Sequence, residues 1–219
     1  MKFNGQRVFA CVAIILIVIL AGTSIFEFAQ LRSDPIRVAC VGDSITVGFQ
    51  YPVDLWQSLG DHYIVGDLGS GGAAVAENSN MSYIGQPAYE VALKFQPDIV
   101  IIMLGTNDAY TTFTENDEDF IIDYVSLIHT FQNLNSKPTV WLVKPIPIYN
   151  NTVSLSNTIL EQKVIPNIEQ VASQTGCQLI DAHTPLLNHP EYYIDGVHPT
   201  ADGARVIADT IYAALTSKN

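Results

Sequence analysis

The chain has 219 residues, of which 48% are hydrophobic, and its formal net charge is −12 at pH 7. This length suits one domain with a sizeable core once a terminal segment is set aside. The negative charge repels phosphate backbones and argues against nucleic acid as a partner. The mean hydropathy of +0.21 is high for a soluble domain, so an apolar segment is expected.

The apolar segment lies at Val8–Phe26, which carries no charge over 19 residues. A helix of this length, at about 1.5 Å per residue, just spans a hydrocarbon core of roughly 30 Å. Lys2 and Arg7 precede the segment, and this positive flank predicts a membrane anchor with the rest of the chain outside. The alternative is a cleaved signal peptide, because Val8–Ala21 has the length of an h-region, although no convincing cleavage site follows it. Both interpretations export the remainder of the chain.

We therefore expect an apolar helix or signal segment at 1–29, a linker at 30–35 and one domain at 36–219. Strand-like and helix-like segments alternate along that domain. The expected strands are Ile36–Val41, Tyr63–Leu68, Asp98–Leu104, Thr139–Val143 and Gln178–Asp181, and the helices that follow them in turn are Pro52–Leu59, Pro87–Phe95, Glu115–Phe131, Leu155–Ser173 and Ala201–Leu215. Pro166 should kink or interrupt the fourth helix. This alternation predicts a five-stranded parallel sheet with helices on both faces, and ligands bound beyond the carboxyl ends of the strands.

Four polar or glycine-rich blocks follow predicted strand ends or lie in the last loop. They are Gly42–Thr46, Gly69–Gly72, Gly105–Asp108 and Asp195–Thr200. Each block alone is weak evidence, because serines and glycine-rich turns are common after strands. Together they supply the parts that acyl transfer requires.

The chemistry assigns a role to one or two residues of each block. A serine hydroxyl needs an adjacent base, which His198 can provide for Ser44, and Asp195 can hold the imidazole tautomer. An oxyanion needs preorganised donors, and the Asn107 amide and the backbone N–H groups of Ser44 and Gly72 can supply them. Gly72 fits because a side chain there would obstruct the substrate carbonyl. No metal-ligand spacing such as Cys-x-x-Cys occurs, so no metal is expected.

The four blocks make the chain similar to the GDSL/SGNH hydrolase superfamily. They read GDSIT at 42–46, GSGG at 69–72, GTND at 105–108 and DGVH at 195–198, in the expected order, and the match runs from about Ile36 to the C-terminus. The resemblance implies a flavodoxin-like three-layer α/β/α fold, a catalytic domain at 36–219 and no cofactor. It implies Ser44 as nucleophile, Gly72 and Asn107 in the oxyanion hole, and Asp195 with His198 as the acid and base.

The second block departs from the family pattern. Asp67 stands where the family often has Asn, and the block ends Gly71-Gly72, which leaves open which of these two glycines is the donor. Two acidic residues in the other blocks are interpreted as structural: Asp43 as a carboxylate that bonds loop N–H groups, and Asp108 as a cap or loop-ordering residue. His62, His129, His183 and His189 have no partner motif and are interpreted as ordinary residues.

The sequence thus predicts a serine esterase that removes a small acyl group, namely acetyl. The segments around the blocks resemble acetylesterase-like members of the superfamily, which implies an extracellular acetylated carbohydrate as substrate. Three alternatives stay open: a sugar O-acyltransferase on the same fold, a lysophospholipase or lipase, and an anchored carbohydrate-binding module without activity. The expected location is a membrane-anchored extracytoplasmic domain, or a secreted one if the apolar segment is cleaved.

Overall fold

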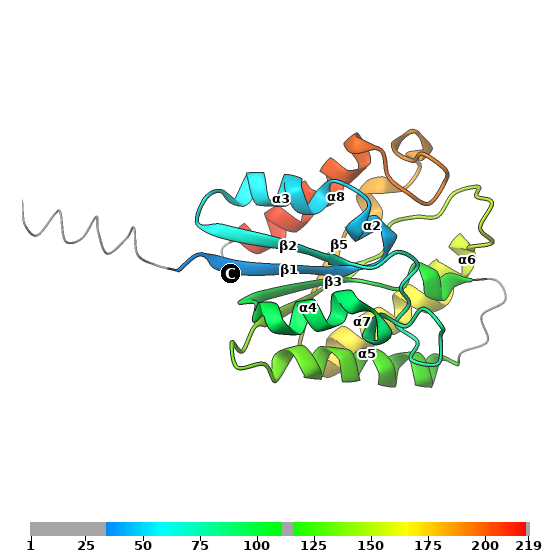
Figure 1. Ribbon diagram of the computed structural model, residues 1–219. Coiled ribbons are helices and arrows are strands. Elements are labelled where there is room, and N and C mark those ends of the chain that lie inside the picture. The colour runs from blue at the N-terminus through cyan, green and yellow to red at the C-terminus, as the bar shows by residue number, and fades with distance from the viewer. Residues whose placement is uncertain (1–33, 111–115, 218–219) are drawn as a thin grey trace, which may run out of the picture. The chain divides into compact units, whose positions relative to one another are not determined.

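The computed structural model describes residues 34–110 and 116–217, and its centre is a five-stranded parallel sheet (Figure 1). The strands are β1 (Ile36–Gly42), β2 (Tyr63–Gly69), β3 (Ile99–Met103), β4 (Thr139–Lys144) and β5 (Gln178–Asp181). Their spatial order is β2-β1-β3-β4-β5, and every neighbouring pair is parallel. All five strands lie where the sequence predicts them, within a residue or two at their ends.

Helices cover both faces of this sheet, which confirms the three-layer α/β/α architecture (Figure 1). The helices are α2 (Ser44–Val47), α3 (Tyr51–Leu59), α4 (Pro87–Phe95), α5 (Asp117–Gln132), α6 (Asn157–Ile159), α7 (Ile165–Thr175) and α8 (Ala201–Thr216). Helices α3 and α8 lie on one face, and α4, α5 and α7 lie on the other. The polypeptide from Ile36 onward forms one compact unit.

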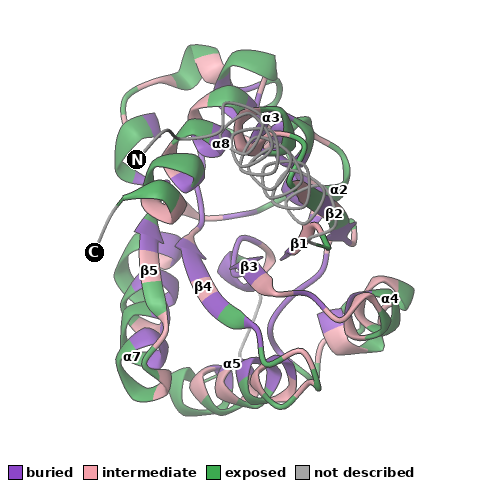
Figure 2. Cartoon of the chain, turned by 90° about the vertical axis from the view of Figure 1, so that its left-hand side faces the viewer, coloured by how far each residue is buried: buried purple, intermediate pink, exposed green. Residues whose placement is uncertain are grey.

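Strand residues alternate between two hydrophobic clusters, one on each side of the sheet. In β1, Ala39 and Val41 pack with the cluster under α4, α5 and α7, whereas Val38 and Cys40 pack with the cluster under α3 and α8. All four residues are fully buried. A strand covered on both faces needs apolar residues at every position, which explains the continuous apolar runs in the sequence. Figure 2 shows the strands as largely buried between more exposed helices.

The predicted helix Leu155–Ser173 is interrupted, as Pro166 required. The structure has α6, then a π-helical turn at Leu160–Val164, and then α7, which starts with Pro166 in its first turn. Proline lacks an N–H group, so Pro166 cannot donate to the preceding turn, and a helix that continues through it must change its hydrogen-bond pattern there. The wider turn ahead of it accommodates the break without ending the helical path.

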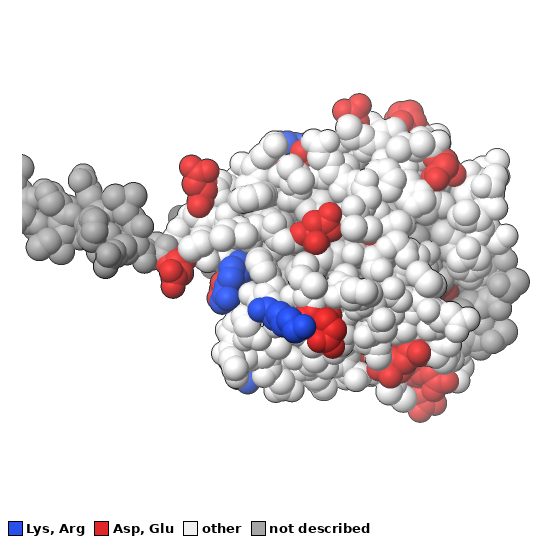
Figure 3. Space-filling view, viewed as in Figure 1, with Lys and Arg blue, Asp and Glu red and all other residues white. Residues whose placement is uncertain are grey.

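The predicted N-terminal apolar helix and the linker up to residue 33 lie outside the described residues. Within 34–110 and 116–217, no helix is long and apolar enough to cross a membrane. Acidic side chains are spread over the face of the domain in Figure 3 and do not gather in one patch.

The order of the strands in the sheet determines which loops can form a ligand site. The chain passes from β1 to β2 on one side and then returns to β3 on the other, so the strand order reverses at β1. The crevice outside the carboxyl ends of the strands at such a point is the usual ligand site of open α/β sheets. The loops after β1, β2 and β3 are therefore neighbours, and they are the loops that carry the first three blocks.

Candidate active site

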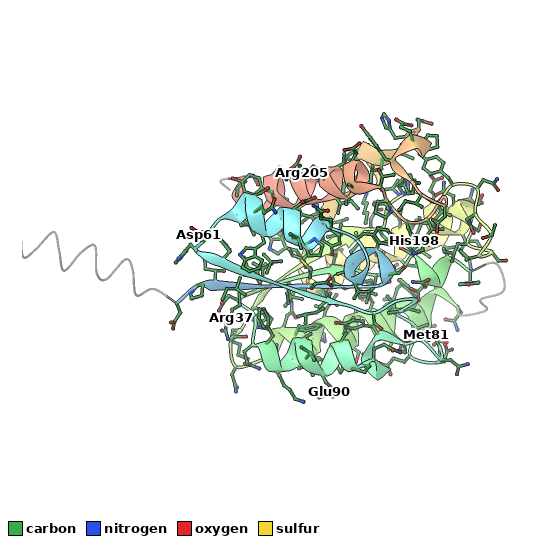
Figure 4. All side chains as sticks on the ribbon, turned by 45° about the horizontal axis from the view of Figure 1, so that its top comes forward. Arg37, Asp61, Met81, Glu90, His198 and Arg205 are labelled. Atoms are coloured by element: carbon green, nitrogen blue, oxygen red, sulfur yellow. The ribbon has the colours of Figure 1, made fainter. Side chains whose placement is uncertain are left out.

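Ser44, His198 and Asp195 form one hydrogen-bonded line. Ser44 Oγ lies 2.9 Å from His198 Nε2, and His198 Nδ1 lies 2.7 Å from Asp195 Oδ2. Ser44 and His198 are 154 residues apart in sequence, so the fold brings them together. Figure 4 shows His198 in the right half of the domain and Arg37, near the start of β1, in the left half, so His198 lies on the side of the carboxyl ends of the strands.

The serine is presented by the short helix α2, whose first residue it is. Asp43 caps this helix, because its Oδ1 accepts the backbone N–H of Ile45 at 2.9 Å. Burial raises the pKa of Asp43 to about 6 from its ordinary 3.8, and the hydrogen bond from Ile45 partly offsets that rise. A capping carboxylate fixes the direction of the first turn, so Asp43 fixes where Ser44 points.

Asn107 connects its own block with the first block and with the residue that follows the second block. Its side-chain Nδ2 donates to the backbone oxygen of Ala73 at 3.0 Å and to Asp43 Oδ2 at 3.3 Å. Ala73 follows Gly72, and Asp43 precedes Ser44, so the amide lies among the residues predicted to bind an oxyanion. Both amide N–H groups have protein partners here, and the bond to Asp43 is the longer one.

Asp108 anchors the loop that follows Gly72. Its carboxylate accepts the backbone N–H groups of Val75 and Ala76 at 3.0–3.1 Å. Burial, joined by the nearby charge of Asp43, raises the pKa of Asp108 to about 6, while the two backbone donors oppose the rise. The interpretation of Asp43 and Asp108 as structural carboxylates is thus confirmed, and both hold parts of the site.

Gly72 has a φ of +75°, in the left-handed region that favours glycine. A Cβ atom there would meet only the Met81 side chain, at 3.5 Å, which is ordinary contact. The backbone conformation therefore accounts for a glycine at this position. A Cβ at Gly71 would meet nothing within 4 Å, and the φ of Gly71 is not positive. Neither space nor backbone conformation therefore requires glycine at residue 71.

Asp195 is fixed by its own loop. Its Oδ1 accepts the backbone N–H groups of Val197 and His198 at 3.0 and 2.8 Å, which leaves Oδ2 for the imidazole. Partial burial raises the pKa of Asp195, but the hydrogen bonds from His198 and Val197 outweigh it and hold this pKa below 3.8. The carboxylate is therefore ionised over the neutral and mildly acidic pH range.

Two of the remaining histidines, His183 and His189, have hydrogen-bond partners away from Ser44. His183 lies 2.8 Å from the Pro145 carbonyl oxygen and 3.3 Å from Glu161, and His189 lies 2.7 Å from Glu191. In the part of the chain that the structure describes, no group of three or more His, Cys, Asp or Glu residues could hold a metal ion.

Sequence reasoning missed one residue at the site, Phe49. Its ring stacks on the ring of His198, with centroids 5.0 Å apart and planes at 19°. Phe49 lies five residues after Ser44 and just outside the first block, so no motif singles it out. Its place on the imidazole depends on the fold that joins residues 49 and 198.

A serine, a histidine and a carboxylate in one line, beside an amide donor and a backbone loop, are the parts of a serine carboxylic ester hydrolase. The family model described as the GDSL-like Lipase/Acylhydrolase family matches residues 40–206. The chain belongs to this family.

Two curated relatives and several solved structures are similar to the chain. Acetylxylan esterase of Xylanibacter ruminicola is 31% identical over 210 residues, which cover 84% of this chain and 44% of that protein. A Bacillus subtilis protein assigned as a peptidoglycan O-acetyltransferase is 28% identical over 184 residues, 83% of this chain and 24% of that protein. The chain thus spans less than half the length of the curated relatives it matches.

The solved structures show the same fold. Est24, a carbohydrate acetylesterase from Sinorhizobium meliloti, has a TM-score of 0.67 at 17% identity, over 83% of this chain and 99% of that chain. The aryl esterase of M. smegmatis has a TM-score of 0.64 at 20% identity, over 83% and 99% of the two chains.

Proposed function

We propose that this protein hydrolyses acetyl esters of a carbohydrate through an acyl-enzyme on Ser44. The observation that carries the proposal is the line from Ser44 Oγ to His198 Nε2 at 2.9 Å and from His198 Nδ1 to Asp195 Oδ2 at 2.7 Å. In this line the hydroxyl can give its proton to the imidazole, and the carboxylate offsets the charge that forms there.

The reaction follows from these positions. Ser44 Oγ attacks the ester carbonyl as its proton moves to His198 Nε2. His198 then gives that proton to the departing alkoxide, which leaves the acetyl group on Ser44. Water attacks this acyl-enzyme with His198 as base, and acetate and free Ser44 result.

The negative oxygen of the tetrahedral intermediate needs donors, and we assign the Asn107 amide and the backbone N–H groups of Ser44 and Gly72 to it. Asn107 shares one amide proton with Asp43 at the longer distance of 3.3 Å. A full negative charge on the substrate oxygen competes for that proton more strongly than a neutral ester carbonyl does. The interaction therefore strengthens in the transition state, which is the condition for catalysis.

The acetyl group and the carbohydrate are supported by the similarity to acetylxylan esterase over 84% of this chain. A series of esters with acyl chains of increasing length measures which acyl group the site prefers. Hydrolysis of p-nitrophenyl esters from acetate to decanoate should be fastest for acetate. A preference for long acyl chains would contradict the proposal and favour a lipase.

Two variants complete this test. Ser44→Ala should lose activity by at least about a thousandfold, because the nucleophile of such a site cannot be replaced. Ser126→Ala, an exposed serine on α5, is the matched control and should keep wild-type activity. Retained activity in Ser44→Ala would remove the proposed nucleophile.

A second candidate function, O-acetyl transfer, is favoured by the similarity to the Bacillus subtilis protein. In transfer, a sugar hydroxyl replaces water at the acyl-enzyme. Acetate release from acetylated xylo-oligosaccharides, measured with and without unacetylated acceptor sugars, separates the two. Hydrolysis predicts free acetate in both cases, whereas transfer predicts new acetylated sugars when acceptors are present.

We also propose that the domain works outside the cytoplasm, on the basis of the apolar segment Val8–Phe26 and the positive charges before it. Protease digestion of cells stripped of any outer membrane and wall, with the cytoplasmic membrane intact, should remove a C-terminal tag from the full chain. Protection of the tag until the cells are lysed would contradict an external domain.

A further inference from the structure

The stack between Phe49 and His198 covers one face of the imidazole. The ring centroids are 5.0 Å apart and the planes are inclined by 19°, which is a parallel stack rather than an edge contact. Phe49 is half-buried, so its ring is part of the surface around His198. Stacked and offset arrangements at this spacing are favourable for aromatic pairs.

The two hydrogen bonds of the imidazole leave one motion free. Nε2 faces Ser44 and Nδ1 faces Asp195, on opposite edges of the ring. These bonds fix the position of the ring along the line between them, but the ring can still tilt about that line. A flat side chain against the ring face opposes this tilt, which neither hydrogen bond does.

The hydrogen bond between His198 and Asp195 is partly exposed to solvent, so a further contact that restrains the imidazole stabilises its orientation. The His198 side chain is 26% exposed and the Asp195 side chain 51% exposed, so water competes for both ends of their hydrogen bond. The loop that carries them has no helix or strand at these positions. Phe49 shields one face of the ring from that water, and an aromatic face also favours the charged imidazolium that forms during the reaction.

The same short segment holds both the nucleophile and this aromatic ring. Ser44 starts α2, and Gly48 ends it one turn later, with its N–H bonded to the Ser44 carbonyl oxygen. A Cβ at Gly48 would lie 2.9 Å from that oxygen, so the tight turn into Phe49 favours glycine. Ser44 and Phe49 therefore belong to one short segment, and both of their side chains contact His198.

We propose that Phe49 is a positioning residue that holds the imidazole of His198 in the plane needed to pass a proton from Ser44 to the leaving alkoxide. This inference rests on the proposed ester hydrolysis. In this role Phe49 does not contact the acyl group of the substrate. Its aromatic ring matters most in the step in which His198 protonates the leaving group.

Two esters with one acyl group isolate that step. The p-nitrophenolate of p-nitrophenyl acetate leaves without a proton, whereas the alkoxide of ethyl acetate needs the proton that His198 carries. In Phe49→Leu, which keeps an apolar side chain but lacks a flat ring, kcat/KM for ethyl acetate should fall by about tenfold. The fall for p-nitrophenyl acetate should be smaller, by about threefold at most, with an unchanged KM.

Conservative variants test the need for a ring. Phe49→Tyr and Phe49→Trp should restore the wild-type ratio of the two kcat/KM values. Trp56→Leu is the matched control, because Trp56 is an exposed aromatic residue on α3 that bonds the Tyr63 carbonyl oxygen, at the start of β2 and away from His198. Its ratio should equal that of the wild type. If Phe49→Leu does not fold, Phe49→Met gives the same comparison.

An equal fall for both esters, or a rise in KM alone, would overturn the proposal, since either points to packing or substrate contact. A fall in Phe49→Tyr as large as that in Phe49→Leu would do so as well. Ser44→Ala measured in parallel keeps the two claims separate. Loss of activity there supports the ester hydrolase whatever Phe49 does, and its retention contradicts the hydrolase itself.

Discussion

At the scale of single residues, the Asn107 amide is the side-chain donor on which the proposed oxyanion hole depends. Asn107→Ala should lower kcat by about 100- to 1,000-fold, or about 3–4 kcal/mol, with little change in KM, because the donor acts on charge that forms in the transition state. Steady-state kinetics on p-nitrophenyl acetate measure this. Asn167→Ala, at a residue of α7 bonded to Asp117, is the control and should match the wild type. A change in KM alone would show that Asn107 binds the ground state.

A second prediction for a single residue concerns Asp108, whose ionisation should make the free energy of unfolding depend on pH. Its pKa of about 6 in the folded chain lies above its ordinary value of 3.8, so between these values the folded state binds more protons. This group therefore lowers stability as the pH rises from 4 to 6.5, by about 2–3 kcal/mol. The Asp108→Asn variant has no ionisable group at this position, so it does not lose this part of its stability as the pH rises.

Urea unfolding at pH 4 and at pH 7.5 checks that sign. Relative to the wild type, Asp108→Asn should be more stable at pH 7.5 than at pH 4 by about 2–3 kcal/mol. Taking the difference between the two proteins removes the titrating groups that do not interact with Asp108, such as Asp195, whose lowered pKa acts in the opposite direction. A difference that does not depend on pH would contradict the raised pKa.

The sequence predicts which site residues come together but not how each one is held. Ser44, Asp195 and His198 follow from the chemistry of their blocks and lie in one line. Phe49 could not be predicted, because its contact with His198 joins two segments through the fold alone. For Gly72 the structure supplies a reason that the sequence does not contain, its left-handed backbone.

At the scale of elements, the junction between β1 and α2 leaves no space for a side chain. A Cβ at Gly42 would lie 2.8 Å from the Met103 backbone oxygen and 2.9 Å from the Thr46 Cβ. Gly42→Ala should therefore displace α2 from the ends of β1 and β3, at a cost of about 1–3 kcal/mol in the free energy of unfolding. Activity should fall as well, because Ser44 starts α2.

Thermal unfolding and p-nitrophenyl acetate kinetics test this together, with Gly85→Ala as the matched control. A Cβ at Gly85 meets nothing within 4 Å, so that variant should keep wild-type stability and activity. Equal stability of the two variants would show that the junction tolerates a side chain.

The sequence predicts the long elements best. Continuous apolar strands and helical spacing identify β1 to β5 and the longer helices, since burial alone dictates those patterns. Helix α2 has only four residues and shows no period, so it is seen only in the structure. The break at Pro166 is predictable from proline chemistry, but the π-helical form of the turn before it depends on packing.

At the scale of the whole molecule, the net charge of −12 affects which esters reach the site. An acetate ester that carries a sulfonate should be repelled at low ionic strength, whereas a neutral one should not. Raising salt from about 0.02 to 0.5 M should increase kcat/KM for the anionic ester by about two- to tenfold, because screening shortens the range of repulsion. The neutral ester is the control. Equal salt responses would contradict a role for the overall charge.

The strand order is a property of the whole molecule that the sequence leaves open. Alternation predicts a parallel sheet, but the order β2-β1-β3-β4-β5 is read only from the pairing. That order makes the loops after β1, β2 and β3 neighbours, which brings three of the four blocks together, and the hydrogen bond between Ser44 and His198 joins the fourth block to them. The resemblance to a known family predicts the same outcome by a different route.

Covalent labelling tests directly whether Ser44 is the nucleophile of an ester hydrolase. A fluorophosphonate forms a stable bond with a serine oxygen that an adjacent histidine activates. Mass spectrometry of the digested protein should find one adduct, on the peptide that contains Ser44, and none in Ser44→Ala. An adduct on another residue, or none on a wild-type protein that hydrolyses p-nitrophenyl acetate, would contradict the account.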